Sequence, residues 1–350
     1  MATAQDGRSL ADFADGLRGR RVAIVYSHRF GAPLDDYWYH RWKTNVIAMF
    51  SQAVEQCGAI PIFFSVEQWL GYCASPHGKV DFLVNLNAGN RSLDQWGIAP
   101  ALGFWLGIPT FPCTAFTVML GEAKDISKRV ARDCGWNTPR GLGEQLSDEC
   151  DVIRKPRTYG SSVGLERLKL RDLGDVENDD IVEEFVAGYD ATIVTLFSAL
   201  TGRLECQGAQ AVIPDRVAPD EWIYDAFEKR NPGVRTQVEF QTCPVDAELA
   251  SRAVDLTRIF GGKFVSRIDV RLKTRPSPSD PIRFDDCVFL EINPMPTIGP
   301  SNSVTEMAAC LVERDAGSRH IAWICSLTPN RIERAAIYIL ACGLWVVSSR

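Results

Sequence analysis

Two stretches in the C-terminal third of the sequence carry oxygen-bearing side chains at a spacing that could hold a metal ion. β-branched and aromatic residues run through 264–272 and through 288–293, which predicts two strands. Side chains alternate between the faces of a strand. One face of the first strand then carries Arg267, Asp269 and Arg271, and one face of the second carries Phe289, Glu291 and Asn293. If the strands pair, two carboxylates and an amide oxygen converge, a set that suits Mg2+ bound to substrate phosphates. The alternative is two sheet strands with polar residues facing water.

A lysine followed by a loop of small residues marks a second candidate site. Residues 151–156 predict a strand that ends in Lys155-Pro156, and 4 of the next 8 residues are glycine or serine. Small residues let backbone N–H groups approach an anion closely, and a nearby lysine suits a phosphate. Upstream, Lys124 and Lys128 lie four apart on a predicted helix, 116–134, which more often marks a solvated face. Such a loop alone is usually a turn, so the phosphate site rests on lysine, loop and downstream carboxylates together.

The stretch between these two regions could cradle a nucleoside. Residues 180–185 predict a strand that leads through 186–190 into a second strand, 191–200. Backbone groups of such a linker could bind an adenine, and a carboxylate could bind the ribose hydroxyls. A hairpin with an exposed acidic turn is the alternative.

The N-terminal third predicts an open α/β unit. Compact apolar runs at 21–27, 60–64 and 80–86 predict buried strands. Residues 35–57 have helical periodicity and end before a glycine. Strand, helix, strand and strand in this order indicate an α/β fold. The aromatic cluster at 37–42 could line a ligand pocket, although core packing and surface cover are the commoner roles of such residues.

Composition narrows the class of protein. The 350 residues are 46% hydrophobic and 23% charged, as in an ordinary soluble protein of two or three domains. A net charge of −6 argues against a nucleic-acid-binding surface. The 11 cysteines form no Cys-x-x-Cys pair, which indicates reduced thiols and a cytoplasmic location. The apolar run 335–347 is shorter than a bilayer span, so we expect a buried terminal helix and no membrane role.

The order of these motifs resembles the ATP-grasp ligases, in particular the D-alanine–D-alanine ligase branch. The matching blocks are Lys124, Lys155-Pro156, Gly160-Ser161-Ser162-Val163-Gly164, Glu183-Glu184-Phe185-Val186 with Gly188, Tyr224-Asp225 with Lys229, Cys243-Pro244, Arg267-Ile268-Asp269 and Glu291-Ile292-Asn293. They cover roughly 102–311. The resemblance implies an α/β ATP-grasp fold, in which central and C-terminal α+β domains sandwich ATP beside an N-terminal open α/β domain. The expected division is an arm at 1–20, a substrate domain at 21–115, a central subdomain at 116–186 and a metal-binding domain at 187–350.

The resemblance also implies a role for each matching residue, with ATP and two Mg2+ ions as cofactors. The nucleotide would be bound by Lys124, Lys155, Ser161, Ser162, Val163, Glu183, Glu184, Phe185, Val186, Asp190 and Lys229. The metal ligands would be Asp269, Glu291 and Asn293. The catalytic residues would be Arg267 near the reacting carbonyl, Tyr224 and Lys229 in a mobile covering loop, and Ser161 in the loop over the phosphates.

The implied chemistry joins an acid to an amine. A carboxylate attacks the γ-phosphate of ATP, and an amine then displaces phosphate from the resulting acyl phosphate. Lysines and Mg2+ must neutralise the anions that meet in the first step, and Arg267 can stabilise the negative oxygen of the second.

Three segments depart from the family pattern and concern the substrates. The first strand leads into His28 and Arg29, where the family has a glycine pair and a glutamate. The third strand leads into 87–91 in place of a His-Gly segment. Thr297 follows Pro296 where the family has the glycine of the oxyanion hole, so Gly299 or Thr297 would supply that donor. Asn302 or Ser303 stands where a serine usually holds the acceptor's carboxylate. These departures favour a specialised ligase, of secondary metabolism, over one that joins two D-alanines.

Three hypotheses follow. The leading one is an ATP-dependent ligase of small, amino-acid-like acids and amines. A close variant closes a ring within one molecule. The third is a regulatory protein that binds ATP without turnover. The family is often dimeric, so a homodimer is a further expectation.

Overall fold

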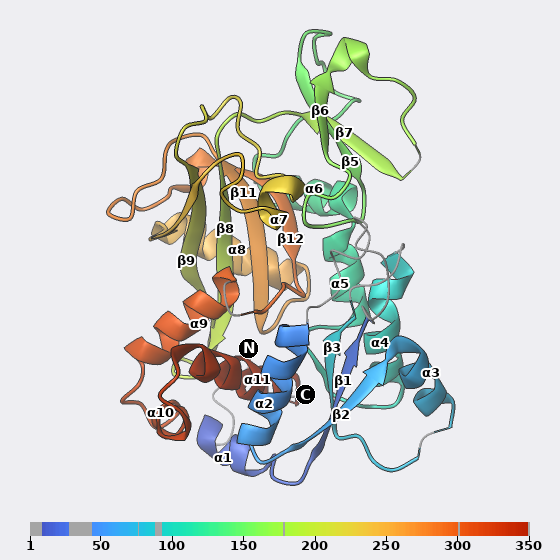
Figure 1. The fold of residues 1–350 in the computed structure, drawn as a ribbon, viewed down its shortest axis with the longest axis vertical. Coiled ribbons are helices and arrows are strands. Elements are labelled where there is room, and N and C mark those ends of the chain that lie inside the picture. The colour runs from blue at the N-terminus through green and yellow to red at the C-terminus, as the bar shows by residue number, and fades with distance from the viewer. Residues whose placement is uncertain are drawn as a thin grey trace.

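The computed structural model describes residues 9–27, 44–75, 77–87, 93–177, 179–299 and 302–348. These residues form three β-sheets with helices packed around them (Figure 1). A small sheet lies at the top of the view, a five-stranded sheet lies in the middle, and a parallel sheet lies at the lower right.

The first sheet is parallel and has the order β2-β1-β3-β4. Its strands are β1 Arg21–Tyr26, β2 Ile60–Ser65, β3 Phe82–Leu86 and β4 Thr110–Phe111. Its helices are α2 Thr44–Gln56, α3 Val66–Ala74 and α4 Leu93–Trp105. The open α/β unit predicted from the apolar runs is therefore present. The aromatic cluster at 37–42 lies outside the described residues.

The other two sheets are antiparallel. The small one has the order β6-β5-β7, from β5 Asp151–Pro156, β6 Glu166–Lys169 and β7 Asp180–Glu184. The large one has the order β10-β9-β8-β11-β12, from β8 Tyr189–Ser198, β9 Arg203–Pro214, β10 Val238–Cys243, β11 Val265–Leu272 and β12 Cys287–Asn293. Helices α7 Ala226–Arg230 and α8 Ala247–Ile259 belong to the same part of the chain.

The register of β11 and β12 corrects one prediction. Asp269 pairs with Glu291, but Val270 pairs with Phe289, because Leu290 is accommodated in a β-bulge. The extra residue reverses the alternation, so Phe289 is fully buried in the core beneath the sheet while Glu291 stays on the opposite face. The prediction that Phe289 shares a face with Glu291 and Asn293 is therefore wrong.

The helix predicted over 116–134 is two helices, α5 Ala115–Glu122 and α6 Lys124–Asp133. The chain leaves the helical conformation at Ala123, with φ −78° and ψ 87°. Because of this break the Lys124 N–H bonds the Arg157 carbonyl at 3.2 Å instead of continuing the first helix. This bond joins the first turn of α6 to the residue that follows β5, the strand that leads into the glycine- and serine-rich loop.

The largest core joins both ends of the sequence. Buried residues of β1, α2 and β8 pack with the C-terminal helices α9 Ser303–Arg314, α10 Ala322–Leu327 and α11 Arg331–Ser348. The N-terminal helix α1 Leu10–Asp15 begins with a capping box at Ser9 and packs on α11, with Leu10 fully buried. No helix in the described ranges is long and apolar enough to cross a membrane.

Candidate active site

Three lysines from two elements converge on two glutamates. Lys128 and Lys155 both pair with Glu183, at 3.0 and 2.5 Å, and Lys128 also donates to the Leu290 carbonyl at 2.7 Å. Lys124 pairs with Glu291 at 3.3 Å and donates to the Tyr159 carbonyl. The amphipathic spacing of Lys124 and Lys128 therefore marks a buried face of α6, and the solvated face that such spacing usually indicates is not found.

Burial and charge oppose each other in this cluster. Burial raises the pKa of Glu183 and of Glu291, but the surrounding lysines outweigh it and hold both pKa values below the usual range. Burial lowers the pKa of Lys155, and Glu183 with Glu291 outweighs it and raises that pKa. For Lys128 burial prevails and lowers the pKa to about 8. Both carboxylates are thus ionised at neutral pH, and the cations around them can exchange partners with an incoming anion.

The candidate metal ligands lie beside this cluster on the paired strands β11 and β12. Arg267 makes two hydrogen bonds to Asp269, at 3.0 and 2.9 Å, and Asn293 lies directly opposite Arg267 in the register. The Asn293 amide donates to Asp269 at 3.2 Å, and the Thr192 hydroxyl donates to it at 2.9 Å. The strand pairing and convergence predicted from the sequence are therefore present, and Thr192 is a contact that sequence reasoning missed.

The donor set fits a hard divalent cation that shares its coordination with phosphates. Asp269 and Glu291 supply carboxylate oxygens and Asn293 an amide oxygen, the ligand types that Mg2+ takes. Across the described ranges, no three His, Cys, Asp or Glu side chains are grouped closely enough to cage an ion. A cation here would therefore need oxygens from a bound ligand, and Arg267 would release part of Asp269 to it.

The small-residue loop is held in an unusual backbone conformation. Ser161 and Ser162 have φ of 55° and 58°, a left-handed region that costs non-glycine residues about 1–3 kcal/mol each. Val163 is 5% exposed, and its N–H donates to the Gly160 carbonyl at 3.2 Å, which closes the turn. The local strain supports a binding role more strongly than the glycine and serine content did.

Residues 222–230, the covering segment, contact this loop. The Lys229 ammonium donates to the Ser162 hydroxyl at 2.7 Å, and that hydroxyl donates to the Tyr224 carbonyl at 3.2 Å. Burial lowers the pKa of Lys229, while Asp190, Asp269 and Glu291 oppose the shift. The structure therefore places Tyr224, Lys229 and the serine loop together, as the sequence predicted.

In the segment predicted to bind the nucleoside, two carboxylates that were expected to contact the nucleotide are instead paired with arginines. Glu184 faces away from the lysines and pairs with Arg140 at 2.6 Å. Asp190, the predicted ribose ligand, pairs with the buried Arg271 at 2.9 Å.

The Phe185 ring lies 3.8 Å beneath the Arg167 guanidinium. Between Val186 and Asp190 the linker turns at Gly188, where φ is 144° and a Cβ would lie 2.2 Å from the Leu272 carbonyl. Only glycine fits that crossing.

Glu122 is a site residue that sequence reasoning missed. It ends α5, which packs so closely on β12 that a Cβ at Gly121 would meet Pro294 at 2.4 Å. Glu122 is 5% exposed and forms no ion pair or hydrogen bond with any residue that the structure describes. Burial raises its pKa to about 8, with Glu291 and Asp269 adding to the shift and Lys124 and Arg267 opposing it. The one sequence signal that could have identified Glu122 as a site residue is its position two residues before Lys124.

The predicted substrate residues are only partly placed. His28 and Arg29 lie outside the described residues. Gly299 is buried, and its carbonyl accepts the Asn302 N–H at 3.0 Å, while Thr297 is exposed. Asn302 precedes α9 as its N-cap, and Ser303, 7% exposed, begins that helix. A Cβ at Gly299 would lie 2.8 Å from Asn302, so these residues form one tight turn after β12.

A neutral polar group lies at the carboxyl ends of β1 and β3. The Ser27 hydroxyl donates to Asn87 at 2.8 Å, the Asn87 N–H donates to Asn85 at 3.1 Å, and the Asn85 amide donates to the Met295 sulfur at 3.1 Å. All three polar residues are at most 5% exposed. Ligands of parallel α/β sheets bind at these strand ends. Met295 follows β12, so the group connects the parallel sheet to the candidate metal site.

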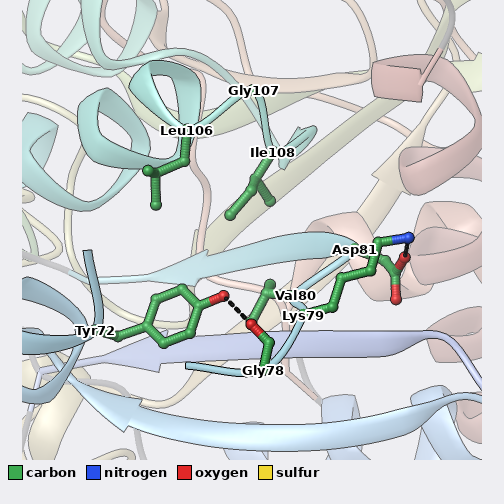
Figure 2. Close-up of a pocket in the computed structure, with 8 residues that line it drawn as sticks. All are labelled: Tyr72, Gly78, Lys79, Val80, Asp81, Leu106, Gly107 and Ile108. Atoms are coloured by element: carbon green, nitrogen blue, oxygen red, sulfur yellow. Dashed lines mark hydrogen bonds and ion pairs between the residues drawn. The ribbon is translucent and has the colours of Figure 1, made fainter. Parts of the chain in front are cut away.

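Figure 2 shows a surface cavity of about 490 Å³ elsewhere on the parallel sheet. It is lined by residues that lead into β3 and β4 and by Tyr72 of α3, whose hydroxyl donates to the Gly78 carbonyl at 3.2 Å. Among the lining residues, Lys79 pairs with Asp81 at 2.9 Å. The cavity therefore lies at the amino ends of these strands, away from the edge at which ligands of such sheets bind.

The two antiparallel sheets, the strained loop and the cluster of cations define an ATP-grasp architecture. Comparison with solved structures agrees. A D-alanine–D-alanine ligase from Bacillus anthracis complexed with ATP superposes with a TM-score of 0.57 at 13% identity, over 91% of this chain and 98% of that one. D-alanyl-alanine synthetase A from Vibrio cholerae gives 0.57 at 13% identity, over 90% and 98%. The VanG D-Ala:D-Ser ligase from Enterococcus faecalis gives 0.54 at 14% identity, over 94% and 100%.

These similarities confirm the ATP-grasp fold of the D-alanine–D-alanine ligases predicted from the sequence. No family model and no curated protein matches the chain.

Proposed function

We propose that the protein is an ATP-dependent carboxylate–amine ligase. The observation that carries this proposal is the buried convergence of Lys124, Lys128 and Lys155 on Glu183 and Glu291 beside the Arg267–Asp269 pair. With Lys229 and Arg267 the cluster holds five basic side chains, and with Asp269 and Glu122 it holds four carboxyl groups. A site of this kind suits a polyphosphate whose negative charge must be neutralised as another anion attacks it.

In the proposed reaction a carboxylate oxygen of the acid attacks the γ-phosphorus, and ADP leaves. The amine nitrogen then attacks the carbonyl carbon of the acyl phosphate, loses a proton, and expels inorganic phosphate to leave an amide. Mg2+, held by Asp269, Glu291 and Asn293, would supply positive charge to the phosphates. Lys155 and Lys124 hold the phosphates, Lys229 closes over the terminal one, and Arg267 donates to the oxygen that becomes negative at the carbonyl.

We further propose that the acid is an amino-acid-like compound other than D-alanine. The neutral group formed by Ser27, Asn85 and Asn87 supports this proposal, because it recognises polar atoms without supplying a charge. The basic sequence at His28 and Arg29 follows directly after it.

The test is hydroxylamine capture of the acyl phosphate. Purified protein, Mg-ATP and hydroxylamine are incubated with each of a panel of carboxylic and amino acids, and hydroxamate and ADP are measured together. A ligase forms hydroxamate and ADP in equal amounts with the right acid. Because hydroxylamine takes the place of the amine, the assay works before the natural amine is known. ATP that binds tightly with no hydroxamate from any acid would favour the regulatory alternative. A product with the mass of a single acid less one water, formed without added hydroxylamine or amine, would identify ring closure.

A further inference from the structure

The buried Arg271 side chain joins three segments that are far apart in sequence. Its Nε donates to the Val186 carbonyl at 3.0 Å, one Nη donates to Asp190 at 2.9 Å, and the other donates to the Trp222 carbonyl at 3.0 Å. The side chain is 5% exposed. A guanidinium can satisfy three such acceptors at once because its donors form a rigid, planar fork.

The same contacts connect the linker after β7 to the covering segment, 222–230. Asp190, held by Arg271, also accepts the Tyr224 N–H at 3.3 Å. The Trp222 ring is 2% exposed and stacks on the Tyr224 ring, with centroids 6.1 Å apart. The start of the covering segment is therefore fixed at the nucleoside end of the site.

The far end of that segment is fixed at the phosphate end. Lys229, near the end of the segment, donates to the Ser162 hydroxyl in the strained loop, and that hydroxyl donates in turn to the carbonyl of Tyr224, which lies nearer the start. Each end of the covering segment thus rests on groups that a nucleotide would touch. At the Arg271 end, one buried guanidinium makes all three of the contacts described above.

We propose that Arg271 is a positioning residue that couples the nucleoside to the placement of Lys229. Its ion pair orients Asp190, and its bond to Trp222 sets where the covering segment begins. The role toward a nucleotide rests on the proposed function, whereas the attachment of the segment is a property of the protein alone.

The experiment measures hydrogen exchange by mass spectrometry in the wild type, Arg271→Met and Arg271→Lys. Arg258→Met, which changes an exposed arginine of α8, is the matched control. In ligand-free protein we expect exchange in 219–231 to speed up roughly tenfold in Arg271→Met, since three bonds to a charged donor are lost. Exchange in α8 should stay as in the wild type, which separates a local attachment from a general loss of stability. Unchanged exchange in 219–231, or equally faster exchange throughout, would overturn the proposal.

A second measurement uses Mg-ATP and inorganic tripolyphosphate as ligands. In Arg271→Met we expect ATP to bind roughly tenfold more weakly and tripolyphosphate to lose much less affinity, because the looser placement of Lys229 affects both ligands whereas the orientation of Asp190 concerns the nucleoside alone. Saturating ATP should slow exchange in 219–231 of the wild type and much less in Arg271→Met. Equal protection at saturation in both proteins would contradict the coupling. Failure of the wild type to bind ATP would instead reject the proposed function, and the ligand-free measurement would still decide the attachment.

Discussion

The two ends of the candidate site are built from different chemistry. The phosphate end consists of buried ion pairs, in which Lys155 and Lys128 share Glu183. The neutral end, at the carboxyl ends of β1 and β3, consists of hydrogen bonds between uncharged groups, from Ser27 through Asn87 and Asn85 to Met295. Under the proposed function the charged group would neutralise the phosphates, and the neutral group would contact the acid substrate. The reaction type and the choice of substrate would then be set by separate parts of the chain.

The largest expected effect is on catalysis at the charged end. Arg267→Met should lower turnover by about 10²–10³-fold, because a donor to the developing negative oxygen is lost. ATP binding should change far less, since the lysines remain. Steady-state ADP release with the acid found by the hydroxamate screen measures both quantities, and Arg258→Met serves as the matched control. A loss confined to ATP affinity would contradict the role given to Arg267.

A stability change should also appear at the charged end. Lys155→Met leaves Glu183 buried with Lys128 as its remaining partner, and breaking such a buried pair typically costs about 3–5 kcal/mol. The cost should shrink at low pH. The pKa of Glu183 is depressed in the folded protein, so its stabilising contribution is present above its ordinary value of 4.5 and is lost as pH falls through the folded value. Urea unfolding of both proteins at pH 7 and at pH 4 measures the difference, and an equal cost at both pH values would contradict it.

Glu122 gives the opposite pH dependence. Its pKa is raised from 4.5 to about 8, so below pH 4.5 it is protonated in both folded and unfolded protein and costs nothing. As pH rises from 4.5 to 8 the unfolded chain ionises first, and the folded state loses stability until the penalty is complete above pH 8. Glu122→Gln should therefore stabilise the ligand-free protein by about 2–5 kcal/mol at pH 9 and hardly at all at pH 4.5. Thermal unfolding across this range tests it, and a variant less stable than the wild type at pH 9 would show that the charged form is needed.

The variant expected to change the KM for ATP least is a substitution at the neutral end, Asn85→Ala. Asn85→Ala removes the acceptor of the Asn87 N–H and the donor to Met295. We expect the KM for the acid to rise by about tenfold, while the KM for ATP changes by less than about twofold, because the two ends are built independently. Equal changes in both values would show that the ends are not separate.

The sequence predicted the charged end better than the neutral end, for a physical reason. Alternation along a strand and the order of the lysine, loop and carboxylate blocks are local patterns, so the pairing of Asp269 with Glu291 could be expected. The bulge at Leu290, the break at Ala123 and the buried Glu122 arise from packing between segments far apart in sequence. The Asn85–Met295 contact, across 210 residues, has no local signal at all.

Product analysis by mass spectrometry tests the central claim most directly. The protein is incubated with Mg-ATP and with D- and L-amino acids, singly and in pairs, and the Glu291→Gln variant is run beside it. The account predicts ADP and a new amide with one particular acid and amine, no D-alanyl-D-alanine from D-alanine, and neither product with Glu291→Gln. Efficient formation of D-alanyl-D-alanine would contradict this prediction, because it would show that the site accepts D-alanine in spite of its neutral end.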